Sequence, residues 1–148
     1  MTTVNVYLNF NGHCKAAFNF YQQVFQAQPA PVQLYDDIPA SPDHPPLPED
    51  AKGKVMHTSL KIGKDTLLMG SDVVEGFGHQ YHQGNSTYIM LDTDSKAEAE
   101  NLHQQLSKNA LQVEMGLEET FFAELYSSFQ DQFGIWWMVH YQGNKMGS

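Results

Sequence analysis

Hydrophobic positions along this chain follow strand and helix periodicities, and the same order of elements occurs twice. In the first half, a β-rich stretch at residues 4–10 is followed by apolar residues at helical spacing from Cys14 to Phe25. In the second half, Ser95 and Glu98 form a capping box before an apolar stripe that ends at Leu106. Further strands are predicted at residues 31–35, 54–62, 66–71, 111–117, 124–129 and 135–141, and residues 88–91 match the first strand. The pattern therefore predicts two βαβββ units.

Direct similarity between the two halves supports a repeat. Tyr7 aligns with Tyr88, a shift of 81 positions that continues into the helices, whereas Leu67 aligns with Trp136, a shift of only 69. The Pro-rich residues 39–50 account for the difference of 12. Because this segment is rich in proline and acidic residues, we expect an exposed loop there rather than a core element.

The predicted fold is of the α+β class, with one domain built from two modules. Residues 1–72 form the first module, residues 73–85 a Gly-rich connector, residues 86–141 the second module and residues 142–148 a tail. Two copies of one unit enclose a site at their junction, so this is where we expect function to lie.

Composition narrows the possible partners. Eight basic and seventeen acidic residues give a net charge of −9, which repels nucleic-acid phosphates and acidic lipid surfaces. No apolar run approaches the roughly 20 residues needed to cross a bilayer. The single cysteine, Cys14, cannot form an intrachain disulfide, and no signal segment opens the sequence. These features predict a cytoplasmic protein without nucleic-acid or membrane partners.

Several motifs together resemble the PhnB-like branch of the vicinal-oxygen-chelate superfamily. They are residues 7–25 (YLNFNGHCKAAFNFYQQVF), 56–63 (MHTSLKIG), 84–86 (GNS), 120–122 (TFF) and 131–138 (DQFGIWWM). That superfamily includes glyoxalase I, extradiol dioxygenases and bleomycin-resistance proteins. The resemblance implies that the modules form a cupped mixed sheet with helices on its outer face, commonly in a homodimer. It does not fix the function, because the fold serves isomerases, oxygenases, lyases and drug-binding proteins.

The resemblance also indicates where metal ligands would stand. In the metalloenzymes of the superfamily, His or Glu side chains project from the first and last strands of each module. The matching positions here are near Tyr7, Met69, Tyr88 and Met138. Thioether and phenol groups bind catalytic divalent metals poorly. The sequence therefore predicts no glyoxalase-type metal site. It also predicts no nucleotide-type cofactor, because it contains no glycine-rich strand-to-helix turn followed by a ribose-binding acidic residue.

Strand alternation predicts which side chains share the open face with these four positions. It adds Asn9, Ser71, Met90, Asp92, Trp136 and His140, and it places His57 and Ser59 opposite the helix-facing Thr58 and Leu60. Phe122 stands where many PhnB-like sequences carry tryptophan, which alters the pocket wall. The predicted ligand pocket comprises Tyr7, Asn9, His57, Met69, Tyr88, Phe122, Glu124, Tyr126, Trp136, Met138 and His140.

This aromatic, thioether-rich surface with few polar groups is typical of a small-molecule pocket. We therefore predict a homodimeric protein that binds a small organic molecule, with catalysis left open. One alternative is a metal-dependent lyase, isomerase or dioxygenase whose site uses His57, Glu124 or His140, the Glu having a pKa raised by burial. Another is a structural or regulatory dimer in which Met69, Trp136 and Met138 simply fill the core.

Overall fold

The computed structural model describes residues 1–29, 31–39, 41–43, 46–76 and 80–145. The chain divides into two compact units, Met1–His82 and Gln83–Ser148, and the division falls within the predicted connector. Parts of the connector, of the Pro-rich segment and of the tail lie outside the described residues. Neither described helix is long and apolar enough to cross a membrane.

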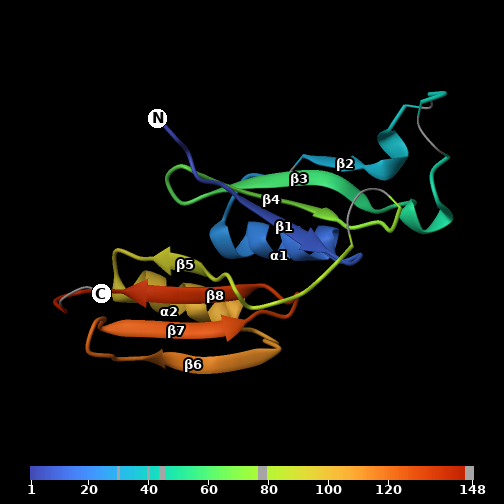
Figure 1. The fold of residues 1–148 in the computed structure, drawn as a ribbon. Coiled ribbons are helices and arrows are strands. Elements are labelled where there is room, and N and C mark those ends of the chain that lie inside the picture. The colour runs from blue at the N-terminus through green and yellow to red at the C-terminus, as the bar shows by residue number, and fades with distance from the viewer. Residues whose placement is uncertain (30, 40, 44–45, 77–79, 146–148) are drawn as a thin grey trace. The chain divides into compact units, whose positions relative to one another are not determined.

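The first unit is a four-stranded mixed sheet with one long helix. Its strands are β1 (Val6–Phe10), β2 (Val32–Leu34), β3 (Val55–Ile62) and β4 (Thr66–Asp72), arranged in the order β1-β4-β3-β2 with β1 parallel to β4. Helix α1 (Cys14–Phe25) packs on β3 and β4, on one side of the sheet (Figure 1). The one-turn helices η1 (Tyr35–Asp37) and η2 (Glu49–Ala51) lie between β2 and β3.

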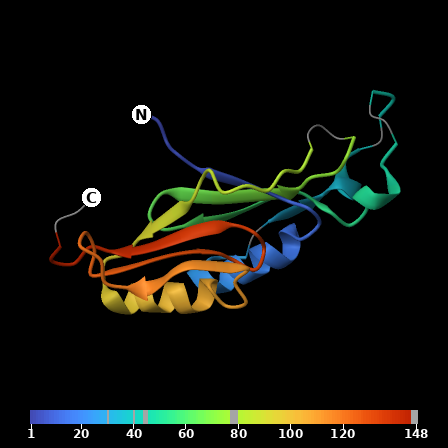
Figure 2. The same cartoon turned by 60° about the horizontal axis from the view of Figure 1, so that its bottom comes forward.

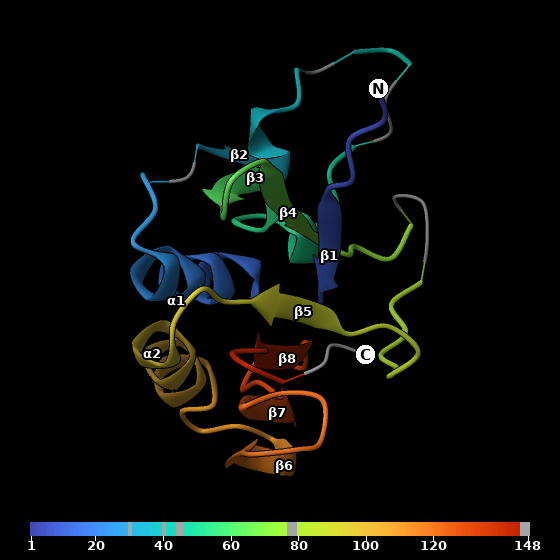
Figure 3. The same ribbon diagram turned by 90° about the vertical axis from the view of Figure 1, so that its left-hand side faces the viewer.

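The second unit repeats this topology. Its strands are β5 (Ile89–Asp92), β6 (Gln112–Glu118), β7 (Leu125–Gln130) and β8 (Trp136–Tyr141), arranged in the order β5-β8-β7-β6 with β5 parallel to β8. Helix α2 (Lys96–Leu106) packs on β7 and β8, and Figure 2 shows it running along one face of the sheet. Seen from the side in Figure 3, each helix lies on one side of its own sheet. The predicted α+β class with two βαβββ units is confirmed.

The sequence periodicity located every long element to within a few residues. The helix from Cys14 to Phe25 is confirmed, and the Ser95 hydroxyl accepts the Glu98 N–H at 3.1 Å, as the capping pattern predicts. The buried face of β3 contains Thr58, Leu60 and Ile62, which agrees with the alternation expected there. The described part of residues 39–50 contains no buried residue, so the expected exposure of that segment is confirmed for those residues.

The predicted shift of 81 between the first strands is wrong by two residues. In unit 1, Val6 of β1 pairs with Leu68 of β4. In unit 2, Ile89 of β5 pairs with Trp137 of β8, the equivalent of Leu68. Ile89 is therefore the equivalent of Val6, and the shift between the first strands is 83. Similar residue types gave the wrong alignment, because the true equivalence depends on backbone pairing. The residue opposite Met138 is therefore Met90 and not Tyr88.

A buried carboxylate organises unit 1. Asp72, at the end of β4, is only 2 % exposed and accepts the N–H groups of Gly12, Cys14 and Val55 at 2.9, 3.0 and 2.9 Å. Cys14 is the first residue of α1, whose N-cap residue makes no side-chain capping bond. The distant carboxylate therefore satisfies a free N–H of the helix and lies near the positive end of the helix dipole.

Unit 2 uses a different buried carboxylate. Asp131 follows β7 and accepts the N–H groups of Phe133 and Ile135 at 2.8 and 3.0 Å, together with the indole N–H of Trp137 at 2.8 Å. Asp131 and Trp137 are both fully buried. These bonds join the tight β7–β8 turn to the largest side chain of the unit's core.

Close packing of α1 on its sheet depends on Gly70. A Cβ atom at this position would lie 2.6 Å from the ring of Phe18. Since such an approach is closer than packed carbon atoms allow, glycine is required for the helix to lie this near β4.

Glu124, just before β7, ties the ends of unit 2 together. One carboxylate oxygen lies 3.3 Å from the Lys96 ammonium at the start of α2, and the other accepts the Asn144 N–H at 2.6 Å. The Asn144 bond and the Lys96 contact lower the pKa of this carboxyl. The expectation of a raised pKa is therefore wrong, because strong hydrogen-bond and charge partners outweigh desolvation here.

We expect Asp72→Asn to lower the free energy of unfolding by about 3 kcal/mol, because an amide NH₂ would face a buried N–H donor and the charge at the helix would be lost. Urea denaturation followed by circular dichroism measures the change. Asp50→Asn, at an exposed position of η2, is the matched control and should leave stability unchanged. A loss no larger than that of the control would show that Asp72 does not organise unit 1.

We expect Glu124→Gln to lower the melting temperature at neutral pH, by less than Asp72→Asn does. A carboxyl whose folded-state pKa is lowered contributes stability above its unfolded-state pKa and loses it as the pH falls through the folded-state value. The difference between the wild type and the variant should therefore disappear in acid. Glu119→Gln, which removes an exposed ion pair with Lys145, is the control for surface charge. A difference that stays constant with pH would contradict this role.

Candidate functional site

The open face of the second sheet, on the side away from α2, gathers the chemically active side chains of that unit. Strand pairing sets Met90 beside Met138, and places His140 between Asp92 on β5 and Tyr126 on β7. Directly paired residues point to the same side of a sheet, so these side chains share one surface. We call it the β8 face.

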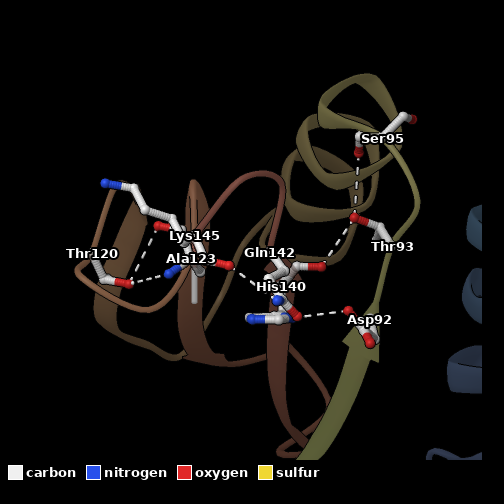
Figure 4. A network of polar contacts seen from close by, with 8 residues as sticks. All are labelled: Asp92, Thr93, Ser95, Thr120, Ala123, His140, Gln142 and Lys145. Atoms are coloured by element: carbon white, nitrogen blue, oxygen red, sulfur yellow. Dashed lines mark hydrogen bonds and ion pairs between the residues drawn. The ribbon is translucent and has the colours of Figure 1, made fainter. Parts of the chain in front are cut away.

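Asp92 and His140 form a hydrogen-bonded pair on the β8 face. The Nδ1 atom of His140 lies 2.9 Å from Oδ1 of Asp92, as Figure 4 shows. An ionised carboxylate only accepts hydrogen bonds, so Nδ1 donates to Asp92; in the neutral form of the imidazole, Nε2 is then an acceptor. The His140 carbonyl also accepts the Thr93 N–H at 2.8 Å and the Thr93 hydroxyl at 3.0 Å. Both the ring and the backbone of His140 are thus fixed.

The second ring nitrogen of His140 has no partner. The side chain is only 6 % exposed, whereas that of Asp92 is 73 % exposed. Among the described residues, Nε2 of His140 is the one buried side-chain nitrogen or oxygen without a hydrogen bond. An unsatisfied buried polar atom costs about 1–3 kcal/mol, so folded proteins seldom keep one without a reason.

Two aromatic side chains, Phe122 and Tyr126, lie beside the His140 residue. The ring of Phe122 lies nearly parallel to the His140 imidazole, at 15° and a centroid separation of 6.3 Å, and meets the ring of Tyr126 edge to face at 5.1 Å. The Thr120 hydroxyl accepts the Phe122 and Ala123 N–H groups at 3.3 and 3.0 Å, which fixes the turn that presents Phe122. The imidazole therefore combines a carboxylate partner with apolar surroundings.

A second polar group lies on the same sheet. The Oε1 atom of Glu114, on β6, accepts the hydroxyls of Tyr88 and Ser128 at 2.8 and 2.7 Å. The Tyr88 ring in turn contacts that of Trp136 at 5.2 Å. The bond to Glu114 raises the pKa of Tyr88, while burial and then the charge of Glu114 raise that of Tyr126. Both phenols are thereby held in their neutral form.

The first unit carries its own group of predicted site residues. Tyr7 and Met69 are paired on neighbouring strands, and Asn9 is paired with Ser71, so all four share the face opposite α1. The ring of His57 lies 5.9 Å from that of Tyr7 on this face. Strand alternation therefore predicted correctly on which face of the first sheet these side chains lie.

The structure differs from the predicted pocket in two respects: the contacts of Glu124 and the polar residues that the prediction omitted. Glu124 is bound to Lys96 and Asn144 and makes no recorded contact with His140 or Tyr126. Sequence reasoning also left Asp92, Glu114 and Ser128 out of the pocket. Alternation had placed Asp92 on the open face, but its pairing with His140 requires the register. The irregular pairing between Val113 and Met115 breaks the alternation around Glu114, so no sequence signal could have located that residue.

The residues at the expected metal positions do not fit a divalent metal. Tyr7 with Met69, and Met90 with Met138, provide phenol and thioether groups where imidazole and carboxylate are needed. The part of the chain that the structure describes contains no group of three or more His, Cys, Asp or Glu residues able to hold a metal ion.

Comparison with known proteins defines the family. The model of the Glyoxalase/Bleomycin resistance protein/Dioxygenase superfamily matches residues 3–139. The chain is 26 % identical to protein YjdN of Escherichia coli over 142 residues, covering 90 % of this chain and 91 % of that protein. It is 35 % identical to protein PA1353 of Pseudomonas aeruginosa, whose crystal structure matches with a TM-score of 0.80 over 96 % of this chain and 98 % of that chain.

A third likeness concerns the fold alone. The PhnB protein of Bacillus cereus, described as a putative 3-demethylubiquinone-9 3-methyltransferase, is 18 % identical and has a TM-score of 0.73, covering 95 % of this chain and 99 % of that chain. The family match and the two four-stranded βαβββ units agree. The chain therefore belongs to the glyoxalase/bleomycin resistance protein/dioxygenase superfamily.

Proposed function

We propose that this protein binds a small organic molecule on the β8 face, without a glyoxalase-type metal site. The observation that carries the proposal is the unpartnered Nε2 of His140, buried among aromatic rings and held in orientation by Asp92. Small-molecule sites combine apolar walls with a few polar groups in fixed positions, and this surface has that composition.

The walls come from Trp136, Met138, Tyr126 and Tyr88. Trp136 is only 8 % exposed, yet its ring contacts Tyr88 on the open side of the sheet rather than a helix. The exposed fraction of Met90 is 46 %, so part of this apolar surface remains open to a ligand. We retain a second candidate binding surface on the open face of unit 1, formed by the predicted pocket residues Tyr7, Asn9, His57 and Met69.

The alternative of an enzyme with an unconventional metal site finds less support. Of the three residues suggested for it, Glu124 is engaged by Lys96 and Asn144, and His57 belongs to unit 1 beside Tyr7. Of these three residues, His140 is the one with a buried ring nitrogen that has no hydrogen-bond partner. This distribution favours ligand binding through one histidine over coordination by three groups.

We further propose that the protein is a cytoplasmic homodimer. The edge strand β6 leaves Val113 52 % exposed, and Leu111 just before it is 60 % exposed. Exposed edge strands with apolar side chains associate readily with a second chain. The structural or regulatory alternative would keep the dimer and lack a ligand.

Binding of a neutral aromatic fragment tests the function directly. With indole as the probe, we expect amide chemical shifts of β5, β7 and β8 to move in a two-dimensional NMR titration while those of α2 stay constant. Tyr88→Ala should weaken indole binding by about fivefold, since an aromatic contact contributes about 1 kcal/mol. Leu67→Ala, which truncates a 39 % exposed apolar side chain of unit 1, is the control. Shifts confined to other surfaces would contradict the proposed site.

The oligomeric state is tested by sedimentation equilibrium at micromolar concentration. We expect a dimer, and we expect Val113→Lys to favour the monomer because charge on an edge strand opposes pairing. Val4→Lys, at another exposed apolar position, is the control. A wild-type monomer at these concentrations would refute the homodimer.

A further inference from the structure

We infer that the ligand of the β8 face is an aromatic molecule with a hydroxyl group, and that this hydroxyl donates a hydrogen bond to Nε2 of His140. The inference rests on the proposed function and specifies its ligand class. It assigns Asp92 and His140 as a binding pair, with Asp92 a positioning residue that acts through the imidazole.

The tautomer of His140 defines which hydrogen-bonding group the ligand must carry. Because an ionised Asp92 carboxylate accepts from Nδ1 at 2.9 Å, Nε2 presents a lone pair when the imidazole is in its neutral form. A carboxylate behind the imidazole strengthens that lone pair as an acceptor. The ligand must therefore bring a donor, and a group that only accepts would leave Nε2 unsatisfied.

Burial decides which kind of donor fits. The His140 side chain is 6 % exposed and lies beside Phe122, which itself meets Tyr126. A charged ammonium group would lose its hydration in such surroundings, whereas a neutral hydroxyl loses far less. The hydroxyls of Tyr88 and Ser128 already satisfy Oε1 of Glu114, so a ligand does not need to neutralise that oxygen.

The charge distribution disfavours acidic ligands. The chain contains no arginine, and β5, β7 and β8 contain no lysine. Two of the lysines of unit 2, Lys96 and Lys145, are paired with Glu124 and Glu119. A ligand carboxylate or phosphate would therefore approach Asp92 and Glu114 without a cation to compensate its charge.

The apolar side chains of the β8 face indicate that the ligand contains an aromatic ring. Phe122 lies nearly parallel to the imidazole, and a hydrogen bond to Nε2 lies in the plane of that ring, so the ligand hydroxyl must approach in the ring plane. The rings of Tyr126 and Trp136 and the thioether of Met138 lie on the same sheet face and provide apolar contact for an aromatic body. A phenol combines both properties in one small molecule.

Two probes of nearly equal shape test this assignment. 4-Cresol carries a hydroxyl that stays neutral at neutral pH, and 4-methylanisole replaces it with a methyl ether that cannot donate. We expect the phenol to bind the wild-type protein about tenfold more tightly, the effect of one well-formed hydrogen bond. Isothermal titration measures both affinities.

Three variants locate the effect. His140→Leu removes the acceptor, and Asp92→Ala releases the imidazole to the other tautomer; both should reduce the preference for the phenol to about twofold or less. Asp92 is largely exposed, so Asp92→Ala remains informative if His140→Leu fails to fold. His82→Gln, at an exposed histidine of unit 1, is the control and should keep the full preference.

The outcomes separate this inference from the proposed function. If both probes bind equally and shift β8-face amides, the face binds organic molecules and the hydroxyl assignment is wrong. If the preference survives in Asp92→Ala and His140→Leu, the hydroxyl meets another group and the assignment is also wrong. If neither probe shifts these amides, both the inference and the proposed function fail.

Discussion

Each unit of this protein depends on one buried carboxylate that accepts several N–H groups. Asp72 accepts three backbone N–H groups in unit 1, and Asp131 accepts two together with the indole N–H of Trp137 in unit 2. A buried charge is tolerated only with such partners. In a chain with eight basic and seventeen acidic residues, hydrogen bonds replace the ion pairs that are not available.

These carboxylates fix the helix and strand positions that determine which side chains lie on the open face of each sheet. Asp72 joins the start of α1 to the start of β3 and the end of β4, so it determines where the helix lies on the first sheet. Asp131 fixes the β7–β8 turn and hence the register in which Tyr126 meets His140. The side chains facing the helices are thereby committed to the core, and the alternate residues are left on the other face.

The β8 face differs from the core in its chemistry. Core polar groups such as Thr58 and Asp131 are bonded, whereas Nε2 of His140 is buried without a partner. Local deviations from full hydrogen bonding mark functional sites more often than structural ones. Superfamily membership establishes the framework, while the proposed ligand chemistry depends on Asp92, His140 and the rings beside them.

The sequence by itself determined the repeated order of elements, the helix from Cys14 to Phe25, the cap at Ser95 and the alternation on β3, because each depends on neighbours a few residues apart. It also placed His140 and Asp92 on one face. Only the tertiary structure decided that their side chains meet, that Met90 rather than Tyr88 lies opposite Met138, and that Glu124 binds Lys96. Strand register and loop contacts join residues far apart in the chain, and a local sequence pattern contains no information about how such distant backbones align.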